Sequence, residues 1–356
     1  MRILFSGYAP VHFLCFKPLY DRLREIPGTE VELSGGIRTK SPYALGGYLY
    51  DHESMYRHFD LPEGAVRSVG SLAKADYDVL FAANTRRIEP RRVGERVQIF
   101  HGMSFRNRAI RPETEGADHY FLLGPYMKRG FAQSGILAAD DPRGVEIGFP
   151  KTDRLVDGSL DRAEMLARHG LRGDRRVVLF APTGERYNSM ETMGEDLIAK
   201  LGAVDRYDVL VKPHDHPHST VDWWERLAPI ESEHVRLVRE PDVTHTLFIA
   251  DLLITDASSV ANEFALLDRP IVFIDVPELF ELTLQKKAML DLETWGRRGG
   301  EVVADVSDAV DAVAAGLADP AARSEVRRAM VADLFFNPGR ATAAAMDWVG
   351  SELEWS

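Results

Sequence analysis

Short, continuously apolar runs alternate with helical patterns along the chain. The apolar runs are rich in valine, isoleucine, leucine and phenylalanine, and they lie at Arg2–Phe5, Tyr77–Ala82, Val97–Phe100, Tyr120–Leu123, Val145–Ile147, Val177–Ala181, Val209–Val211, Val235–Val238, Leu252–Ile254 and Ile271–Ile274. Such runs are typical of strands buried on both faces, as in a parallel sheet. Helical periodicity separates them at Pro18–Glu25, Tyr126–Gln133, Arg162–His169, Met190–Leu201, Val221–Leu227, Ser259–Leu267 and Val306–Leu317. The pattern predicts an α/β protein.

The alternation falls into two sets, which predicts two domains. The length of 356 residues agrees, because a domain usually holds about 150 residues. Glycine and proline interrupt both periodicities between Gly148 and Asp153, and we place the boundary there. We expect an N-terminal domain over residues 1–150, a second domain over residues 151–325, and a helical C-terminal segment over residues 326–356.

Composition and charge exclude several classes of protein. The chain is 45% hydrophobic and 28% charged, which is too apolar for a disordered protein. Its 43 lysines and arginines against 55 aspartates and glutamates give a net charge of -12, which argues against a general nucleic-acid binder. The only cysteine, Cys15, excludes an internal disulfide framework and a cysteine-rich zinc site. Because the sequence has neither a signal-peptide pattern nor a run of roughly 18 apolar residues, we expect a cytoplasmic protein.

The first chemical candidate is His101, which follows a predicted strand directly and precedes Gly102. Open α/β sheets bind ligands at the carboxyl ends of their strands, so His101 is expected to face a ligand. Imidazole titrates near neutral pH and can remove a proton from an attacking hydroxyl group. The alternative is a histidine that caps the next helix or bonds to a neighbouring loop.

The loop Lys212-Pro-His214-Asp-His216-Pro-His218 follows the strand Val209–Val211. Its three histidines and its aspartate are compatible with a zinc site. The prolines, however, predict a turn and not the helix on which histidine pairs usually bind metal. We therefore favour contact of Lys212 and His214 with a ligand anion and expect no metal, while the roles of His216 and His218 stay open.

A third candidate is the turn Thr255-Asp256-Ala-Ser258-Ser259 after the strand Leu252–Ile254. Ser258 or Ser259 is a good N-cap, and the free N–H groups at a helix start can hold a phosphate. Glu263 lies one turn into the helix, where a carboxylate could bind a ribose diol. An ordinary capped helix would fit the same sequence.

Weaker signals come from two other segments. The loop that contains Thr183 and Arg186 also follows a strand and is expected to reach the same ligand. Asp76-Tyr-Asp78 has the form of a metal-binding pair, but it precedes its strand, which favours a solvated position. Neither a G-x-G-x-x-G sequence nor a Walker loop occurs, so the common dinucleotide and nucleoside triphosphatase signatures are absent.

Arginines gather between residues 84 and 111, where eight of them accompany only two glutamates. A charged stretch is usually a solvated surface. In a chain of net negative charge, this reversal beside His101 could also receive an anionic acceptor or a lipid surface.

The order of these motifs resembles the CDP-glycerol glycerophosphotransferase family, the polymerases and primases of teichoic acid and related capsule synthesis. The motifs are His101-Gly, Gly148-Phe-Pro-Lys-Thr-Asp153, Lys212-Pro-His214, Thr255-Asp-Ala-Ser-Ser259 with Glu263, and Asp268-Arg-Pro270, with weaker similarity at Phe335-Phe-Asn-Pro-Gly-Arg340. The resemblance implies a GT-B fold, with two Rossmann-like domains whose parallel sheets face each other across a cleft. The first domain would bind the acceptor and the second the nucleotide donor, and the C-terminal helices would pack back toward the first.

The resemblance also implies roles for residues. His101 would deprotonate the acceptor hydroxyl, and His214 would contact the donor's phosphates. The donor site would further hold Lys212, Ser258, Ser259, Glu263, Asp256, Thr183 and Arg186, and the acceptor site Arg106 and Arg108.

The implied reaction moves glycerol phosphate, or a related alditol phosphate, from a CDP-activated donor to a hydroxyl acceptor and releases CMP, without a metal or cofactor. The expected partners are that donor and an anionic or lipid-linked acceptor, with peripheral contact at the cytoplasmic face of the membrane and no nucleic acid.

The sequence departs from the family pattern at two places. The family usually has an aromatic residue and Arg-Asp where Gly184-Glu185-Arg186 stands, and a simpler His-Pro in the histidine loop. The same order of motifs resembles non-hydrolysing UDP-N-acetylglucosamine 2-epimerases, which carry two glycines at the place of Ser258 and Ser259. The serines favour the phosphotransferase over an epimerase or a nucleotide-sugar glycosyltransferase. A non-catalytic nucleotide-binding protein is the other alternative.

Overall fold

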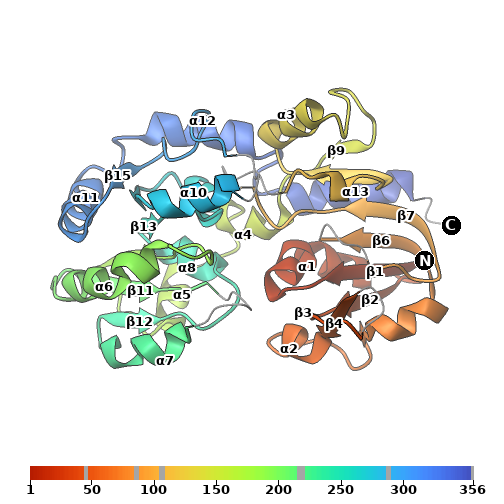
Figure 1. Cartoon of the computed structure of the whole chain (residues 1–356), viewed down its shortest axis with the longest axis horizontal. Coiled ribbons are helices and arrows are strands. Elements are labelled where there is room, and N and C mark those ends of the chain that lie inside the picture. The colour runs from red at the N-terminus through yellow and green to blue at the C-terminus, as the bar shows by residue number, and fades with distance from the viewer. Residues whose placement is uncertain (44–46, 84–87, 104–108, 215–220, 286–289, 354–356) are drawn as a thin grey trace. The chain divides into compact units, whose positions relative to one another are not determined.

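Two compact units, each built on a parallel sheet, make up the chain (Figure 1). The computed structural model describes residues 1–356 except 44–46, 84–87, 104–108, 215–220, 286–289 and 354–356. Unit 1 holds the described residues of 1–102, 109–153 and 333–356. Unit 2 holds Met103 and the described residues of 154–332.

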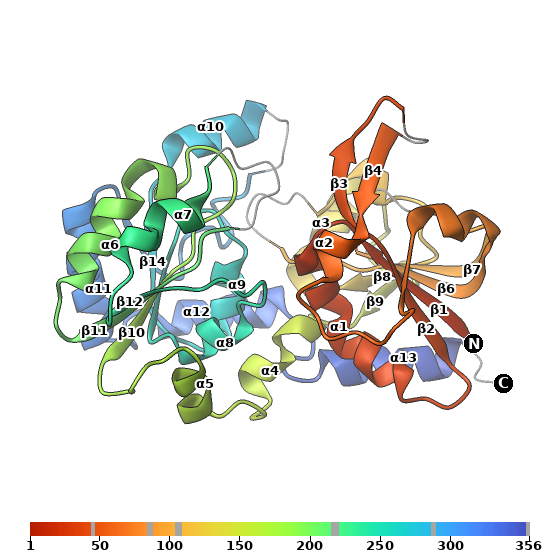
Figure 2. The same ribbon diagram turned by 90° about the horizontal axis from the view of Figure 1, so that it is seen from below.

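The sheet of unit 1 has seven strands in the order β5-β2-β1-β6-β7-β8-β9, all paired in parallel. The strands are β1 (Arg2–Gly7), β2 (Glu30–Gly35), β5 (Val66–Arg67), β6 (Asp76–Ala82), β7 (Arg92–Gln98), β8 (His119–Leu122) and β9 (Gly144–Glu146). The helices are α1 (Pro10–Arg24), α2 (His52–Tyr56), α3 (Pro125–Ser134) and α13 (Ala341–Glu352). An antiparallel hairpin of β3 (Ile37–Lys40) and β4 (Tyr48–Asp51) projects from this unit apart from its sheet (Figure 2).

The sheet of unit 2 has six parallel strands in the order β12-β11-β10-β13-β14-β15. The strands are β10 (Arg176–Phe180), β11 (Tyr207–Val211), β12 (Val235–Leu237), β13 (Leu252–Thr255), β14 (Ile271–Ile274) and β15 (Glu301–Val303). The helices are α5 (Arg162–Arg168), α6 (Glu195–Gly202), α7 (Trp223–Leu227), α8 (Thr244–Ile249), α9 (Val260–Ala265), α10 (Pro277–Gln285), α11 (Val306–Ala318) and α12 (Ser324–Leu334), while α4 (Asp153–Val156) begins at the boundary.

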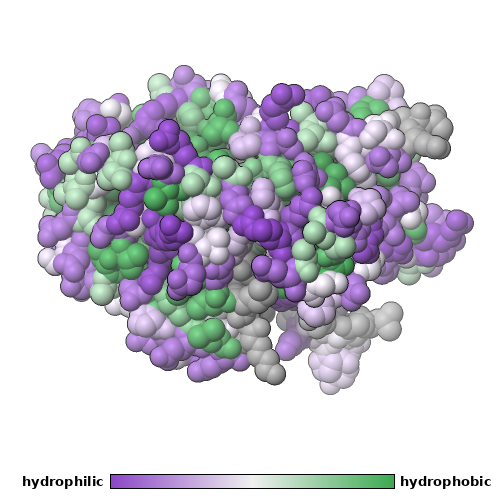
Figure 3. All heavy atoms as spheres, turned by 90° about the horizontal axis from the view of Figure 1, so that it is seen from above, coloured by the Kyte–Doolittle hydropathy of each residue, from purple (hydrophilic) through white to green (hydrophobic). Residues whose placement is uncertain are grey.

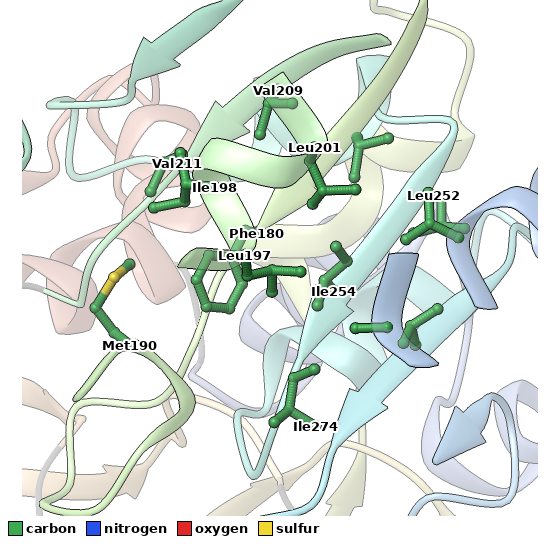
Figure 4. Packing of buried hydrophobic residues seen from close by; sticks show 14 of the residues in the cluster. Phe180, Met190, Leu197, Ile198, Leu201, Val209, Val211, Leu252, Ile254 and Ile274 are labelled. Atoms are coloured by element: carbon green, nitrogen blue, oxygen red, sulfur yellow. The ribbon is translucent and has the colours of Figure 1, made fainter. Parts of the chain in front are cut away.

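Both faces of the unit 2 sheet are buried, which explains its continuously apolar strands. Phe180 of β10 packs with Ile254 and with α6 residues such as Leu197 on one face (Figure 4). Its neighbour Leu179 belongs to a second core on the opposite face, which Phe264 of α9 also joins. Because successive strand residues point to opposite faces, a strand between two helical layers needs apolar residues at every position. The predicted α/β fold with parallel sheets is confirmed.

Helix α1 is longer than the sequence predicts, because it begins at Pro10 and contains Pro18. A proline suits the first turn, where its missing N–H would have no helical partner. Inside a helix it costs about 3 kcal/mol. Burial of Phe13, Phe16 and Leu19 in the core of unit 1 offsets this cost, so tertiary packing overrides the local signal.

The sequence pattern does not predict strand β2, whose residues Glu-Val-Glu-Leu-Ser-Gly do not form a continuously apolar run. In the sheet, Glu32 of β2 is only 6% exposed. Its carboxylate accepts from Arg2 Nη2 at 3.1 Å and Tyr77 Oη at 2.6 Å, and pairs with Arg67 Nη1 at 3.3 Å. These partners come from β1, β5 and β6, so only the assembled sheet can make a buried carboxylate tolerable here.

Two of the sequence motifs meet inside unit 1. Gly148 adopts a φ of +94°, and a Cβ at this position would lie 2.0 Å from the carbonyl oxygen of Phe336. Asn337 donates from Nδ2 to the carbonyl oxygens of Glu146 at 2.9 Å and Ile147 at 3.1 Å. The Gly-Phe-Pro and Asn-Pro-Gly motifs therefore fasten the returning chain to the carboxyl end of β9.

Asp153 holds the start of α13 in the same unit. Its Oδ1 accepts from the N–H of Ala341 at 2.9 Å, and its Oδ2 accepts from the N–H of Thr342 at 2.7 Å. A carboxylate at a helix start satisfies free N–H groups and opposes the helix dipole. Within the expected C-terminal segment 326–356, residues 326–332 belong to unit 2 and the residues from Asp333 onward belong to unit 1.

Among the described residues, no helix is long and apolar enough to cross a membrane. On the face drawn in Figure 3, hydrophobic side chains lie in small groups among hydrophilic ones.

Candidate functional site

Asp256 is the centre of the loops at the carboxyl ends of β10 and β13. It is fully buried, and its Oδ1 accepts from the N–H groups of Thr183 at 2.8 Å and Ala257 at 2.5 Å. Its Oδ2 accepts from Ser189 twice, from the N–H at 2.9 Å and from Oγ at 2.8 Å. Both carboxylate oxygens are thus occupied by protein donors. The sequence predicts donor contact for Asp256, and its geometry indicates that it orders the loops that would make such contacts.

His214 lies against the backbone of the Thr183 loop. A Cβ at Gly184 would lie 2.6 Å from His214 Nδ1 and 2.8 Å from Cγ, so the imidazole occupies the space of a side chain. The ring itself is exposed. Because β10 and β11 are neighbours, their carboxyl-end loops meet here. The glycine that departs from the family pattern therefore provides room for the predicted phosphate-binding histidine.

The side chain of Lys212 is more buried than that of a surface lysine that binds phosphate would be. It is 7% exposed, and its Nζ lies 3.3 Å from the carbonyl oxygen of Pro213 and 5.2 Å from the centre of the Trp224 ring. The ammonium group therefore contributes positive charge from within the histidine loop. Direct contact of Lys212 with a donor remains a prediction.

Ser258 and Ser259 precede α9, as the sequence predicts. Ser259 occupies the N-cap position with helical backbone angles, and its side chain makes no capping hydrogen bond. Within the described part of the chain, no protein group accepts a hydrogen bond from the N–H of Ser258 or Ser259. The turn thus presents two backbone donors beside two hydroxyl groups, a combination suited to phosphate oxygens.

Inside α9, Asn262 and Glu263 are both buried, at 8% and 3% exposure. Asn262 donates from Nδ2 to the carbonyl oxygen of Met103 at 2.6 Å. The helix therefore holds the residue that comes two positions after His101, a contact that the sequence did not suggest. The ribose role of Glu263 stays a prediction.

Arg186 is exposed, and its guanidinium lies 5.1 Å from the ring centre of Tyr187. Tyr187 adopts a left-handed φ of +63°, and its N–H is accepted by Glu191 Oε2 at 2.6 Å. Arg186 thus lies in the same loop as Thr183, and its contact with the donor stays a prediction.

In unit 1, His101 lies beside a second histidine. β7 ends at Gln98, and two further residues lead to His101, which is exposed. Gly102 takes a φ of +128°, so the backbone turn itself favours the glycine of the His-Gly pair. The ring centres of His101 and His12 are 4.8 Å apart. No motif pointed to His12, because it comes from α1, about 90 residues earlier in the chain.

His12 is 2% exposed. Its Nδ1 accepts from the N–H of Tyr8 at 3.2 Å, so the neutral ring carries its proton on Nε2. Burial, followed by the positive charges of His101 and Arg38, holds the pKa of His12 well below its ordinary value of 6.5. His101 can therefore take up a proton without repulsion from a charged neighbouring imidazole.

Part of the arginine-rich stretch is engaged in ion pairs. Arg91 pairs with Asp76, and its Nε donates to Asp76 Oδ1 at 2.8 Å. Arg96 pairs with Glu89 at 3.3 Å. Asp78 accepts from the backbone N–H of Arg2 at 2.6 Å, so both aspartates of the Asp-x-Asp pair have protein partners at the start of β6. The pair does not precede its strand as expected, because β6 begins at Asp76 itself. Asp76 is half-buried and Asp78 is exposed, which agrees with the solvated position expected for the pair.

Several predicted residues lie outside the described part of the chain. They are Arg86, Arg87, Arg106, Arg108, His216 and His218. Among the residues that are described, no group of three or more His, Cys, Asp or Glu side chains is arranged to hold a metal ion.

Comparison with known proteins agrees with the motif order. A model of the family described as CDP-Glycerol:Poly(glycerophosphate) glycerophosphotransferase matches residues 63–345. The teichoic acid glycerol-phosphate primase of Bacillus subtilis (strain 168) is 31% identical over 121 residues, which cover 33% of this chain and 29% of that protein. The teichoic acid poly(glycerol phosphate) polymerase of Staphylococcus epidermidis is 30% identical over 146 residues, which cover 38% of this chain and 19% of that protein. The matched part of the chain thus spans only 19% to 29% of the length of these curated relatives.

Solved structures show the same fold. The wall teichoic acid polymerase TagF superposes with a TM-score of 0.68 at 17% identity, covering 99% of this chain and 89% of that chain. A UDP-GlcNAc 2-epimerase from Neisseria meningitidis, bound to UDP-GlcNAc, superposes with a TM-score of 0.55 at 10% identity, covering 98% and 99%. Both resemblances that the motif order suggested are thus present at the level of the fold.

Proposed function

The chain belongs to the CDP-glycerol:poly(glycerophosphate) glycerophosphotransferase family, and on that premise we propose that it transfers glycerol phosphate, or a related alditol phosphate, from a CDP-linked donor to a hydroxyl acceptor in cell-surface polymer synthesis. The observation that carries the proposal is the loop assembly around Asp256. It brings the Thr183 loop and the Ser258 turn together, while Gly184 admits the ring of His214.

The proposed step begins at His101, whose imidazole takes the proton from the acceptor hydroxyl. The hydroxyl oxygen attacks the phosphorus that carries the glycerol and forms a new phosphodiester bond. The bond between that phosphorus and the bridging oxygen breaks, and CMP leaves with the bonding electron pair. His101 then releases its proton to water or to the departing phosphate, which returns the base to its neutral form.

On the donor side, negative charge grows on the leaving phosphate. His214 and the N–H groups of Ser258 and Ser259 are the proposed groups that stabilise this charge, and fixed donors of this kind usually supply the largest electrostatic contribution. We further propose that no metal ion takes part, so EDTA should leave the rate unchanged.

The test uses the purified full chain with CDP-glycerol and a glycerol-phosphate oligomer as acceptor, with and without EDTA. The expected result is CMP release that depends on the acceptor. A parallel reaction with UDP-N-acetylglucosamine examines the epimerase alternative. Release of UDP without any turnover of CDP-glycerol would overturn the proposal.

His101→Ala tests the base directly. Loss of a positioned general base should lower the rate by about 10²- to 10⁴-fold while CDP-glycerol still binds, as calorimetry would measure. His58→Ala is the control, because His58 is an exposed histidine of the same unit. If His101→Ala abolished donor binding as well, the assignment of His101 as the base would be wrong.

We also propose peripheral contact with an anionic membrane surface through the arginine-rich stretch. The described ion pairs of Arg91 and Arg96 reduce the charge available for this contact. Co-sedimentation with anionic vesicles should therefore be weak and should disappear as salt is raised. Binding that does not respond to salt would contradict this proposal.

A further inference from the structure

In unit 1, a guanidinium group of the hairpin lies against two aromatic rings. Arg38 of β3 lies with its Cζ 4.3 Å from the ring centre of Tyr8 and 4.5 Å from that of Tyr48. Tyr8 follows β1, whereas Tyr48 is the first residue of β4. Contact with two rings restricts the planar group and leaves its N–H edge as the direction in which it can donate.

Arg38 has no anionic partner among the described residues. Seven other described arginines of unit 1 do pair with a carboxylate, namely Arg2, Arg22, Arg67, Arg91, Arg96, Arg129 and Arg143. Arg38 is half-buried, and none of its guanidinium N–H groups donates a hydrogen bond within the described chain. Removing a cation from water without an anion is costly, and aromatic contact offsets only part of that cost. The site is therefore suited to an anion supplied by a ligand.

Lys40 adds to the positive charge of the hairpin. It lies two residues beyond Arg38 on the same strand, so its side chain is on the same face of the hairpin. It is exposed, and it too has no carboxylate partner in the described part of the chain. An anion at Arg38 would thus meet a second cation nearby.

A series of ring contacts connects Arg38 to the proposed base. The Tyr8 ring, which Arg38 contacts, lies 4.4 Å from the His12 ring, centre to centre. The His12 ring in turn lies 4.8 Å from that of His101. The charge of Arg38 also acts on His12. Arg38 and His101 thus belong to one cluster inside unit 1, on which a single extended ligand could contact both.

We propose that Arg38 binds a phosphate of the acceptor, the group next to the hydroxyl that His101 deprotonates. The proposal rests on the proposed function for the role of His101. In a glycerol-phosphate end, a three-carbon unit separates the terminal hydroxyl from its nearest phosphate. A guanidinium donates two parallel hydrogen bonds to such a phosphate, which fixes both its position and its orientation. Arg38 would therefore select an anionic acceptor over an uncharged alcohol.

Arg38→Met removes the charge and the donors, and Arg38→Lys keeps the charge but not the two-pronged geometry. CMP release is measured while the acceptor oligomer and CDP-glycerol are varied separately. Arg38→Met should raise the KM for the oligomer roughly 10- to 100-fold and leave the KM for CDP-glycerol unchanged, with Arg38→Lys in between. The control is Arg22→Met, because Arg22 is an exposed arginine of the same unit with only a 4.0 Å ion pair.

A binding measurement without catalysis separates this proposal from the proposed function. Calorimetry with the glycerol-phosphate oligomer alone should show binding to the wild type that weakens in Arg38→Met and not in Arg22→Met. If no variant or wild type released CMP, but Arg38→Met still lost oligomer binding, the transferase would fail and the anion site would stand. An unchanged oligomer affinity in Arg38→Met, or a raised KM for CDP-glycerol alone, would overturn the anion site as an acceptor site.

Discussion

Asp256→Asn is the most direct test of how the candidate donor site is held together. The native carboxylate accepts from Thr183 and Ala257 with one oxygen and from Ser189 with the other. An amide of the same shape keeps one acceptor and replaces the other with an NH2 group. Only the hydroxyl of Ser189 can turn and accept from that group, so we expect the NH2 to face Ser189. The backbone N–H of Ser189 then loses its partner, whereas that of Thr183 keeps its own.

The free-energy cost of the lost Ser189 hydrogen bond can be estimated from its burial. Asp256 is fully buried, so water does not replace the missing acceptor. A hydrogen bond to a charged group contributes about 1.5–3 kcal/mol. Because about 1.4 kcal/mol corresponds to a factor of ten, the Ser189 loop should open about 10- to 100-fold more often.

Hydrogen exchange of individual backbone amides measures this opening. Exchange at Ser189 should accelerate by that factor, while exchange at Thr183 changes much less. Asp251→Asn is the control, since Asp251 accepts from the N–H of Val177 at 2.8 Å near the opposite end of β10. That variant should affect Val177 and leave CDP-glycerol affinity intact. Unchanged exchange at Ser189 would refute the reasoning. Loss of donor binding with unchanged exchange would mean that Asp256 contacts the donor itself.

Two further predictions concern the histidines. Gly184→Ala places a methyl group 2.6 Å from His214 Nδ1 and must displace the ring, so the KM for CDP-glycerol should rise about 10-fold without loss of folding stability. Gly70→Ala, at a position with open space, is its control, and an equal KM in both variants would contradict a phosphate role for His214. For His12, burial lowers the pKa in the folded protein below the ordinary value of 6.5. As the pH falls, His12 therefore binds a proton in the unfolded chain at a higher pH than in the folded protein. The contribution of His12 to the free energy of unfolding should be constant above about pH 6.5 and should decrease by up to about 1.4 kcal/mol for each pH unit below it. Urea titrations at several pH values should find this slope reduced in His12→Asn.

The motifs that resemble the family are of two kinds: some carry candidate catalytic residues, and others hold parts of the fold together. Asp268-Arg-Pro270 follows the candidate motif of Ser258 and Glu263 in the sequence. In the structure, however, Asp268 Oδ1 accepts a hydrogen bond from Arg327 Nε of α12 at 3.0 Å and so holds that helix in place. The Gly148 and Asn337 motifs likewise hold the returning chain in unit 1. Motif order alone assigns no role to such residues, because a residue required for packing and a residue required for chemistry leave the same signal in one sequence.

By itself, the sequence determined the two α/β sets and the turns that carry His101, His214 and Ser258. The reason is local: a strand covered on both faces must be apolar throughout, and polar residues can begin only where the strand ends. Tertiary structure alone decided the features that depend on distant partners. Pro18 lies within a helix because α1 is buried, and Glu32 lies within a sheet because cations from other strands surround it. The same holds for His12 beside His101 and for Arg38 against Tyr8 and Tyr48, since residues far apart in the chain become neighbours only when the sheet forms.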